Sequence, residues 1–318
     1  MHSVFTMLNS IELKNMIEAY DTIVVFRHVF PDGDALGSQL GLVKTLRLNY
    51  PEKTIYAVGS NDHHYTIYPE MDVVDLEGVK FLSIVVDTAN RPRVDDDRYT
   101  MGDKIIKIDH HPEVDPYGDL QLVDTDRGSA CEIMTDLLRD MGMQFNEDIA
   151  VTLLSGIITD TIRFSIEKVS HLTLESAAFL MKQGANISEL NNKLSIQPKE
   201  IFKTRAIIMN LAQLKGGLSY VILNKEDLSQ FPVDSKGVKS QVNAMAGIED
   251  FKIWALFVQD EDGSYEGSLR ARYHTINDVA ESYGGGGHRL ASGVSKLTLD
   301  NVYEMIEILS KRSEENYA

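Results

Sequence analysis

Short apolar runs alternate with amphipathic stretches over the first half of the chain. The run TIVVF (22–26) precedes a stretch with apolar residues at helical spacing, ALGSQLGLVKTLRLNY (35–50). Further β-branched, apolar runs lie at 54–60, 81–89 and 103–111. Near-continuous apolar strands that alternate with helices are typical of a parallel sheet covered on both faces. The pattern therefore predicts an α/β fold with a mostly parallel sheet and helices on both faces.

Apolar residues at helical spacing also predict helices at residues 11–20 and in three segments after Ser129. After Gly184 the pattern of apolar and polar residues changes. Residues 187–202 are polar, contain a proline and predict a linker or a linking helix. We expect two domains on either side of it, at 1–186 and 203–318. The second, smaller α/β domain is predicted to contain a first helix, a strand at 218–224, a helix around 238–247, antiparallel strands at 251–260 and 264–273, a glycine-rich loop and a last helix at 299–311.

Charge and cysteine content narrow the classes of function. The net charge of −17 over 318 residues disfavours binding to long duplex nucleic acid, which needs a large basic face. A short anionic substrate in a local basic pocket is compatible with it. Cys131 is the only cysteine, so an internal disulfide is excluded; we expect a buried side chain and a cytoplasmic protein. The sequence shows no signal peptide and no apolar run near the ~20 residues that span a bilayer, so we expect no membrane association.

Three of the predicted strands end in side chains that bind metals. The residues at or just beyond these ends are His28, Asp32, Asp34, Asp87, Asp109, His110 and His111. The carboxyl ends of parallel strands lie along one edge of the sheet, so these groups should converge. Each motif alone also fits a turn or a helix cap, and Asp34 stands where a helix N-cap is expected. Their recurrence along one edge favours a metal site.

The mixture of side chains points to the kind of ion. Imidazoles and carboxylates without a thiolate suit Mn²⁺ first, with Mg²⁺, Co²⁺ or Zn²⁺ as substitutes. The number of carboxylates suggests two ions, which a bridging carboxylate can hold ~3.5–4 Å apart in enzymes that cleave phosphate esters. Asp160 ends the apolar stretch LLSGIITD and is a further candidate, because a buried aspartate is unfavourable unless it is paired or ligating.

The motifs resemble those of a known family. HVFPDGDALGS, VVDTAN, IDHHP and GIITDT, in this order, are similar to the four motifs of the DHH phosphoesterase superfamily. YGGGGHRLASG, with SLRAR upstream, is similar to the nucleic-acid-binding DHHA1 domain. The combination covers nearly the whole chain and resembles the NrnA-type nanoRNases. Members of that family hydrolyse short oligoribonucleotides and 3′-phosphoadenosine 5′-phosphate (pAp).

The resemblance implies six metal ligands and two catalytic residues. The ligands would be His28 and Asp32 for one ion, Asp34, His110 and Asp160 for the other, and Asp87 as the bridge. His111 would face the scissile phosphate, and Asp109 would orient an imidazole.

The resemblance also implies a substrate-binding set in the second domain. Its members are Ser268, Arg270, Gly285, Gly286, Gly287 and His288. Glycines let backbone N–H groups approach a phosphate closely, and arginines add charge-assisted donors. Arg270 and Arg272 alternate on a predicted strand and are expected on one face, although a solvated strand edge would explain them equally. Ile162, Arg163 and Arg289 depart from the family pattern and leave the substrate preference open.

The leading hypothesis is a two-metal hydrolase of short oligoribonucleotides and pAp. A phosphodiesterase for cyclic or linear dinucleotides is the first alternative. A manganese-dependent inorganic pyrophosphatase has no use for the GGGGH and SLRAR segments, and a single-strand DNA exonuclease would be expected to be longer. A nucleotide-sensing module with an inactive metal site is a further alternative, which the complete ligand set disfavours. A homodimer is compatible with the sequence.

Overall fold

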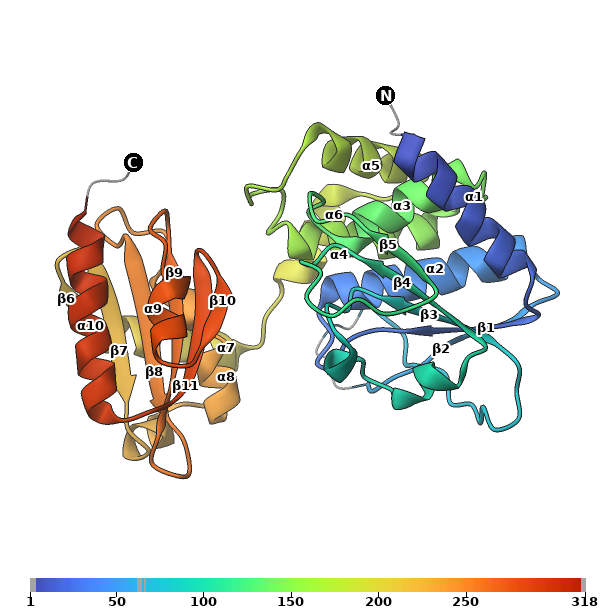
Figure 1. Ribbon diagram of the computed structural model, residues 1–318. Coiled ribbons are helices and arrows are strands. Elements are labelled where there is room, and N and C mark those ends of the chain that lie inside the picture. The colour runs from blue at the N-terminus through green and yellow to red at the C-terminus, as the bar shows by residue number, and fades with distance from the viewer. Residues whose placement is uncertain (1–3, 62–64, 66, 316–318) are drawn as a thin grey trace. The chain divides into compact units, whose positions relative to one another are not determined.

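The computed structural model describes residues 4–61, 65 and 67–315 (Figure 1). The chain divides into two compact units, Met1–Ile196 and Gln197–Ala318. Among the described residues, none of the helices combines the length and the hydrophobicity that crossing a bilayer requires.

The first unit is built on five parallel strands in the order β2-β1-β3-β4-β5. The strands are β1 (Thr22–Phe26), β2 (Thr54–Ala57), β3 (Leu82–Val86), β4 (Lys104–Asp109) and β5 (Leu120–Val123). The order changes direction beside β1, because β2 lies on one side of it and β3, β4 and β5 on the other. A crevice for ligands forms at such a switch point, at the carboxyl ends of the strands. The three strands that end in candidate ligands, β1, β3 and β4, are neighbours in this sheet.

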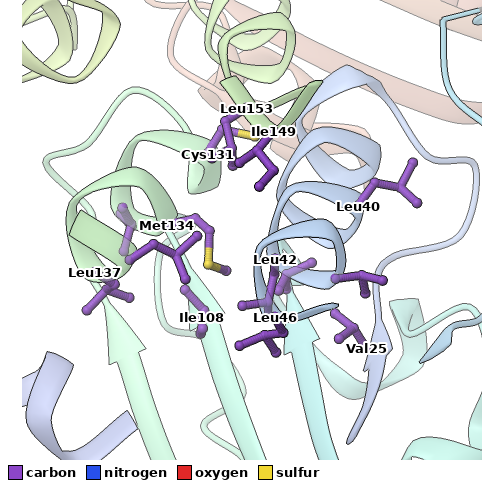
Figure 2. Packing of buried hydrophobic residues seen from close by; sticks show 14 of the residues in the cluster. Val25, Leu40, Leu42, Leu46, Ile108, Cys131, Met134, Leu137, Ile149 and Leu153 are labelled. Carbon is purple, nitrogen blue, oxygen red and sulfur yellow. The ribbon is translucent and has the colours of Figure 1, made fainter. Parts of the chain in front are cut away.

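Among the described residues, six α-helices lie over one face of this sheet, some directly on the strands and others on neighbouring helices. They are α1 (Val4–Glu18), α2 (Gly33–Asn49), α3 (Ala130–Asp140), α4 (Glu147–Asp160), α5 (His171–Lys182) and α6 (Ile187–Ser195). Their apolar side chains form one core cluster with alternate strand residues (Figure 2). In that view Val25 and Ile108 of the strands lie near Leu42 of α2 and Met134 of α3. Cys131 is buried in this cluster, as expected.

The opposite face of the sheet is covered differently. The connection between β3 and β4 contains two 3₁₀-helices, η1 (Arg91–Arg93) and η2 (Asp97–Met101). Tyr99 of η2 packs with Phe26 and with Tyr117, which lies in a loop, in a separate cluster. The predicted α/β fold is confirmed, but the helices of this connection are short 3₁₀-helices. The helix predicted at 11–20 also begins earlier, at Val4.

The second unit contains a six-stranded sheet in the order β10-β11-β9-β8-β7-β6, in which only β7 and β8 are parallel. Its strands are β6 (Gln213–Lys215), β7 (Leu218–Leu223), β8 (Ile253–Gln259), β9 (Tyr265–Ala271), β10 (Gly286–His288) and β11 (Ala291–Leu297). Its helices are α7 (Lys199–Leu211), η3 (Glu226–Gln230), α8 (Ser235–Lys239), η4 (Val242–Met245), α9 (Asn277–Ser282) and α10 (Leu299–Glu314).

The two faces of the second sheet are covered to different extents. Helices α9 and α10 pack on one face. On the other face, α7, α8 and η4 pack on β7 and β8, and their cluster contains no residue of β9, β11 or β10. We call the part of this second face that β9, β11 and β10 form the open half-face.

Two local predictions differ from the structure in the second half of the chain. The predicted glycine-rich loop contains strand β10, since Gly286 and His288 pair with β11. The helix predicted around 238–247 is split into the short elements α8 and η4. Residues 187–202, predicted as a linker or a linking helix, hold α6 and the first turn of α7.

Candidate metal centre

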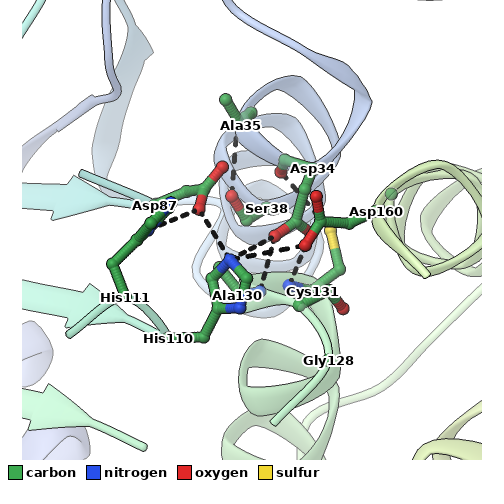
Figure 3. Close-up of polar contacts among 12 residues, drawn as sticks. Asp34, Ala35, Ser38, Asp87, His110, His111, Gly128, Ala130, Cys131 and Asp160 are labelled. Atoms are coloured by element: carbon green, nitrogen blue, oxygen red, sulfur yellow. Dashed lines mark hydrogen bonds and ion pairs between the residues drawn. The ribbon is translucent and has the colours of Figure 1, made fainter. Parts of the chain in front are cut away.

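The candidate ligands at the ends of β1, β3 and β4 meet in one cluster (Figure 3). Three overlapping sets each have ligand atoms within 4.8 Å of one another. The sets are His28, Asp32 and Asp87; Asp34, His110 and Asp160; and Asp87, His110 and His111. The structure therefore brings together all six residues that the resemblance suggested as ligands, from four separate segments of the first unit.

Asp87 lies at the centre of the cluster. Its Oδ2 is 3.5 Å from His28 Nε2, and its Oδ1 is 3.4 Å from His110 Nε2. The side chain is buried, and Oδ1 has no hydrogen-bond partner among the described residues. Its φ of 48° is left-handed, a conformation that aspartate adopts more readily than most residues. A buried carboxylate whose two oxygens face two different imidazoles has the arrangement that a shared ligand of two cations requires.

His28 and Asp32 form one side of the cluster. The contact of 2.8 Å between His28 Nδ1 and the carbonyl of Val29 assigns the ring proton to Nδ1 and leaves Nε2 facing the carboxylates. Asp32 is the N-cap of α2, where its Oδ1 accepts hydrogen bonds from the N–H groups of Asp34 and Ala35, each at 3.0 Å. The expectation that Asp34 caps this helix is wrong. Asp34 lies two residues further in, within reach of α3.

Asp34 is held by the N-terminus of α3. Its Oδ2 accepts a hydrogen bond from Ala130 N at 2.6 Å, and its Oδ1 accepts one from Cys131 N at 2.9 Å (Figure 3). Burial, with the charges of Asp87 and Asp160, raises the pKa of Asp34 well above its usual range. A cation beside these carboxylates would relieve their repulsion.

His110 connects Asp34 to Asp160, the last residue of α4. Its Nε2 lies 3.4 Å from Asp160 Oδ2 and 3.8 Å from Asp34 Oδ2, while its Nδ1 lies 3.3 Å from the carbonyl of Arg127. Burial and the charge of Asp87 raise the pKa of Asp160 to about 6, against the opposing effect of His110. Burial would lower the pKa of His110, but the hydrogen bond and charge of Asp87 outweigh it and raise the value to about 10. Acidic groups thus dominate the site.

His111 and Asp109 form a separate pair beside the ligands. His111 Nδ1 lies 2.8 Å from Asp109 Oδ1, and the imidazole is 30% exposed. Asp109 is fully buried. Burial opposes ionisation of Asp109, but its bond to His111 outweighs burial, so its pKa is lowered. This pair can fix a histidine ring at the exposed border of the cluster.

The candidate substrate residues of the second unit lie in two rows on the open half-face. His288 pairs with Ala291, which pairs with Arg270; Gly286 pairs with Gly293, which pairs with Ser268. Residues paired directly across strands point to the same face. Only the small residues Ala291 and Gly293 separate Ser268 and Arg270 from β10, so this part of the sheet forms a shallow floor.

The other candidates in this unit have different surroundings. Side chains at Gly285 and Gly287 would run into main-chain carbonyls of β11, whereas Gly286 has open space beside it. Arg272 lies beyond the end of β9 and donates to the carbonyls of Ile248 and Glu249. Arg272 therefore lies just past the strand that was expected to carry it, with its guanidinium bound to main-chain carbonyls.

Close packing of α2 against α4 supports the site and was not anticipated. Gly33, Gly37 and Gly41 lie four residues apart on α2. A methyl group at Gly37 would stand 2.9 Å from Cys131 Sγ, 3.0 Å from the carbonyl of Thr152 and 3.2 Å from Gly156 Cα. The four-residue spacing in GDALGSQLG was the available signal. It brings α4, and with it Asp160, against the helix that carries Asp34.

Comparison with known proteins agrees with this geometry. Residues 22–157 match the N-terminal domain of the DHH family, and residues 218–315 match the DHHA1 domain. A Streptococcus mutans protein named probable bifunctional oligoribonuclease and PAP phosphatase NrnA is 39% identical over 302 residues, 93% of this chain and 97% of the relative. The chain belongs to the DHH phosphoesterase family. The resemblance expected from the sequence is thereby confirmed, and this DHH phosphoesterase is a hydrolase that acts on phosphoester bonds.

Two further similarities extend over the whole DHH phosphoesterase chain. The bifunctional oligoribonuclease and PAP phosphatase NrnA of Bacillus subtilis is 37% identical over 315 residues, which cover 95% of this chain and 99% of the relative. The crystal structure of an exopolyphosphatase-related protein from Bacteroides fragilis superposes with a TM-score of 0.83 at 19% identity, over 97% of this chain and 98% of the other. The second similarity supports the fold alone.

Proposed function

We propose that the protein hydrolyses phosphoester bonds in short oligoribonucleotides and in pAp. It would use two divalent metal ions, with Mn²⁺ as the preferred ion. The observation that carries the proposal is Asp87, whose two oxygens face His28 and His110. The names of the relatives from Streptococcus mutans and Bacillus subtilis support this choice of substrates. We assign the cytoplasm as its location, in keeping with a single, buried cysteine.

The first unit would hold the ions. The proposed ligands are His28, Asp32, Asp34, Asp87, His110 and Asp160. Two ions bound there supply the Lewis acidity that stabilises charge at a phosphoryl group during in-line displacement. The chain contributes His111, whose ring is fixed through Nδ1 by Asp109 and which can exchange a proton with the reacting phosphoester at Nε2. We assign this chemistry to the domain at 1–186.

The second unit would hold a part of the substrate other than the phosphate that reacts. Arg270 donates to the carbonyls of Leu269 and Ser292, and burial lowers its pKa, with no acidic neighbour among the described residues contributing to the shift. An arginine without a carboxylate partner is well suited to a phosphate. With Ser268, His288 and the N–H groups of Gly285, Gly286 and Gly287, it would grip a second phosphate or a terminal nucleotide. We assign this role to the domain at 203–318, after the linker.

Arg270→Ala tests the proposal. Removing a charge-assisted contact of about 1.5–3 kcal/mol should lower kcat/KM for pAp and for a short RNA roughly ten- to a hundredfold. Bis-(p-nitrophenyl) phosphate has neither a second phosphate nor a nucleoside for Arg270 to hold, so its hydrolysis with Mn²⁺ should stay within about twofold. Arg312, which pairs with Asp278 on α9, provides the matched control, and Arg312→Ala should leave all three substrates unaffected.

Two results would contradict the proposal. An equal loss on all three substrates would mean that Arg270 supports the fold or the metal centre. Hydrolysis of cyclic or linear dinucleotides, with neither pAp nor RNA dimers to pentamers cleaved, would favour the alternative phosphodiesterase. Products resolved by chromatography separate these outcomes.

A further inference from the structure

A lysine is buried beneath the candidate metal centre. Lys107 on β4 is 0% exposed and is among the largest fully buried side chains. An ammonium group without water is strongly unfavourable unless it is paired. Lys107 and Asp109 are two residues apart on one strand, so their side chains leave the sheet on the same face.

Three groups fix the Lys107 ammonium. Nζ lies 3.2 Å from Asp109 Oδ2, donates to the carbonyl of Ala89 at 3.0 Å, and lies 4.9 Å from the centroid of the Tyr117 ring. Tyr117 is itself fixed, because its hydroxyl donates to the carbonyl of Thr88 at 3.1 Å. The ammonium therefore has one defined position, between the loop after Asp87 and the end of β4.

The two oxygens of Asp109 have different tasks. Oδ1 accepts hydrogen bonds from His110 N at 2.9 Å, from His111 N at 3.3 Å and from the His111 ring at 2.8 Å. Oδ2 has no hydrogen bond of normal geometry among the described residues and faces Lys107. The final torsion of an aspartate side chain is soft, so contacts at both oxygens are needed to define the carboxylate plane.

We propose that Lys107 is a positioning residue that acts through Asp109. By holding Oδ2, it keeps Oδ1 aimed at the His111 ring, and it thereby keeps that ring directed toward the reacting phosphate. The inference rests on the proposed phosphoester hydrolysis, because His111 has this role only there.

A purely structural role would not require a lysine. A buried ion pair is often no more stable than apolar side chains of similar volume, and methionine has nearly the length of lysine. The ion pair adds a fixed orientation of the Asp109 carboxylate, because the ammonium is held by Ala89 and Tyr117 and in turn holds one carboxylate oxygen. The orientation of His111 is therefore the property to measure.

The test is a double-mutant cycle in the full-length protein with Mn²⁺ and a short RNA. Lys107→Met should lower kcat roughly ten- to a hundredfold, the effect of removing a partner that orients an active-site group, with KM changed less than about threefold. Asp109→Asn should lower kcat at least as much. The double variant should equal Asp109→Asn within about twofold, because both changes remove the same orientation. Lys44→Met, which breaks an ion pair with Asp148 elsewhere in the first unit, should leave kcat unchanged.

A second measurement does not depend on activity. In chelator-treated protein labelled with ¹⁵N-histidine, the proton on His111 Nδ1 should give a resonance protected from exchange by its bond to Asp109. Asp109→Asn should abolish this protection, and Lys107→Met should reduce it at least tenfold. If wild-type protein hydrolyses no phosphoester, the proposed function fails, whereas the resonance still reports whether Lys107 orients His111.

Two outcomes would overturn the inference. Losses that multiply in the double variant would mean that Lys107 acts by another route, such as the loop at Ala89. Unchanged kcat and unchanged protection in Lys107→Met would leave only a packing role. If Lys107→Met fails to fold, the double variant, which removes both charges, is compared with Asp109→Asn alone, and a further tenfold loss there contradicts the proposal.

Discussion

At the scale of the residue, the position of Asp87 leads to a prediction about stoichiometry. Asparagine tolerates the left-handed backbone at φ 48°, so Asp87→Asn removes charge without imposing a new conformation. Because Asp87 faces both groups of ligands, this variant should lose both ions in a calorimetric titration with Mn²⁺. Asp160→Asn should lose one. Activity of Asp87→Asn should fall about a thousandfold or more.

The control for this experiment is a check that both variants are folded. Circular dichroism of both variants should match that of the wild type. Retention of more than about a tenth of the activity by Asp87→Asn, or loss of a single ion, would contradict the bridging role.

The protonation of His28 predicts a pH dependence of stability without metal. Burial would lower its pKa, but hydrogen bonds to Asp32 and Asp87 outweigh burial and raise it to about 10. A histidine whose pKa is raised in the folded state stabilises the fold. This contribution is fully present below about pH 6.5, near the pKa in the unfolded chain, and is lost as pH rises through about 10. The free energy of unfolding of chelator-treated protein should therefore fall between these pH values, with at most about 1.4 kcal/mol for each pKa unit.

Urea titrations at several pH values check this dependence. His28→Gln should flatten the decline, while His171→Gln, at an exposed helix start, should not. Protonated Asp160 also stabilises the metal-free fold, at lower pH. This contribution to the free energy of unfolding is present below about pH 3.8 and is lost as pH rises through about 6. An equally steep decline in His28→Gln would show that other groups are responsible.

At the scale of the element, the contact between α2 and α4 predicts unequal effects of two glycines. A methyl group at Gly37 meets the main chain of α4 at Thr152 and Gly156, whereas one at Gly41 meets the side chain of Leu153. The main-chain atoms of α4 can make room for the methyl group only if the whole helix moves. Gly37→Ala should cost about 1–2 kcal/mol, as overpacking exceeds the gain in helix propensity, and Gly41→Ala should cost less.

The same displacement should reach the metal ligands. Because Asp160 ends α4, Gly37→Ala should weaken binding of one Mn²⁺ about tenfold, while Gly41→Ala should leave both affinities within about twofold. Urea unfolding and calorimetry of the two variants provide the comparison. Equal metal affinities in both would mean that the spacing of these helices does not determine the site.

Sequence patterns located the strands well and the caps poorly. The apolar runs before His28, Asp87 and Asp109 were sufficient to place these residues at one edge, because strand direction alone determines where strand ends lie. In D-G-D either aspartate can cap a helix, and the contact that decides between them is with α3, about a hundred residues later in the chain. Lys107 could not be recognised as buried, because its partners at Ala89 and Tyr117 come from other segments.

The sequence patterns also did not predict the two short strands β5 and β10. β5 has four residues, too few for its alternation to identify a strand, and β10 has three, of which two are glycines. The partner strand determines their conformation. The open half-face that β10 completes was therefore visible only as a glycine-rich motif.

At the scale of the whole molecule, the net charge of −17 predicts how substrate length and salt interact. A long RNA experiences more of the repulsion from the protein than a pentamer does, and salt screens this repulsion over ~10 Å at 0.1 M. The ratio of kcat/KM for a pentamer to that for a 25-mer should therefore fall as salt rises from about 20 to about 300 mM, a range over which the screening length shortens about fourfold. An uncharged crowding agent serves as a control for viscosity, and a ratio that rises with salt would contradict the argument.

The close approach of α2 and α4 also limits how the chain can be recombined with its relatives. Gly37 and Gly156 leave room for each other and for Cys131, so the three positions are suited to one another as a set. A chimera with a crossover between these helices would combine a surface shaped for one partner with the surface of another. Crossovers that keep residues 33–160 from a single parent preserve the set, and the natural place for exchange is the boundary at Ile196, after the whole unit is complete.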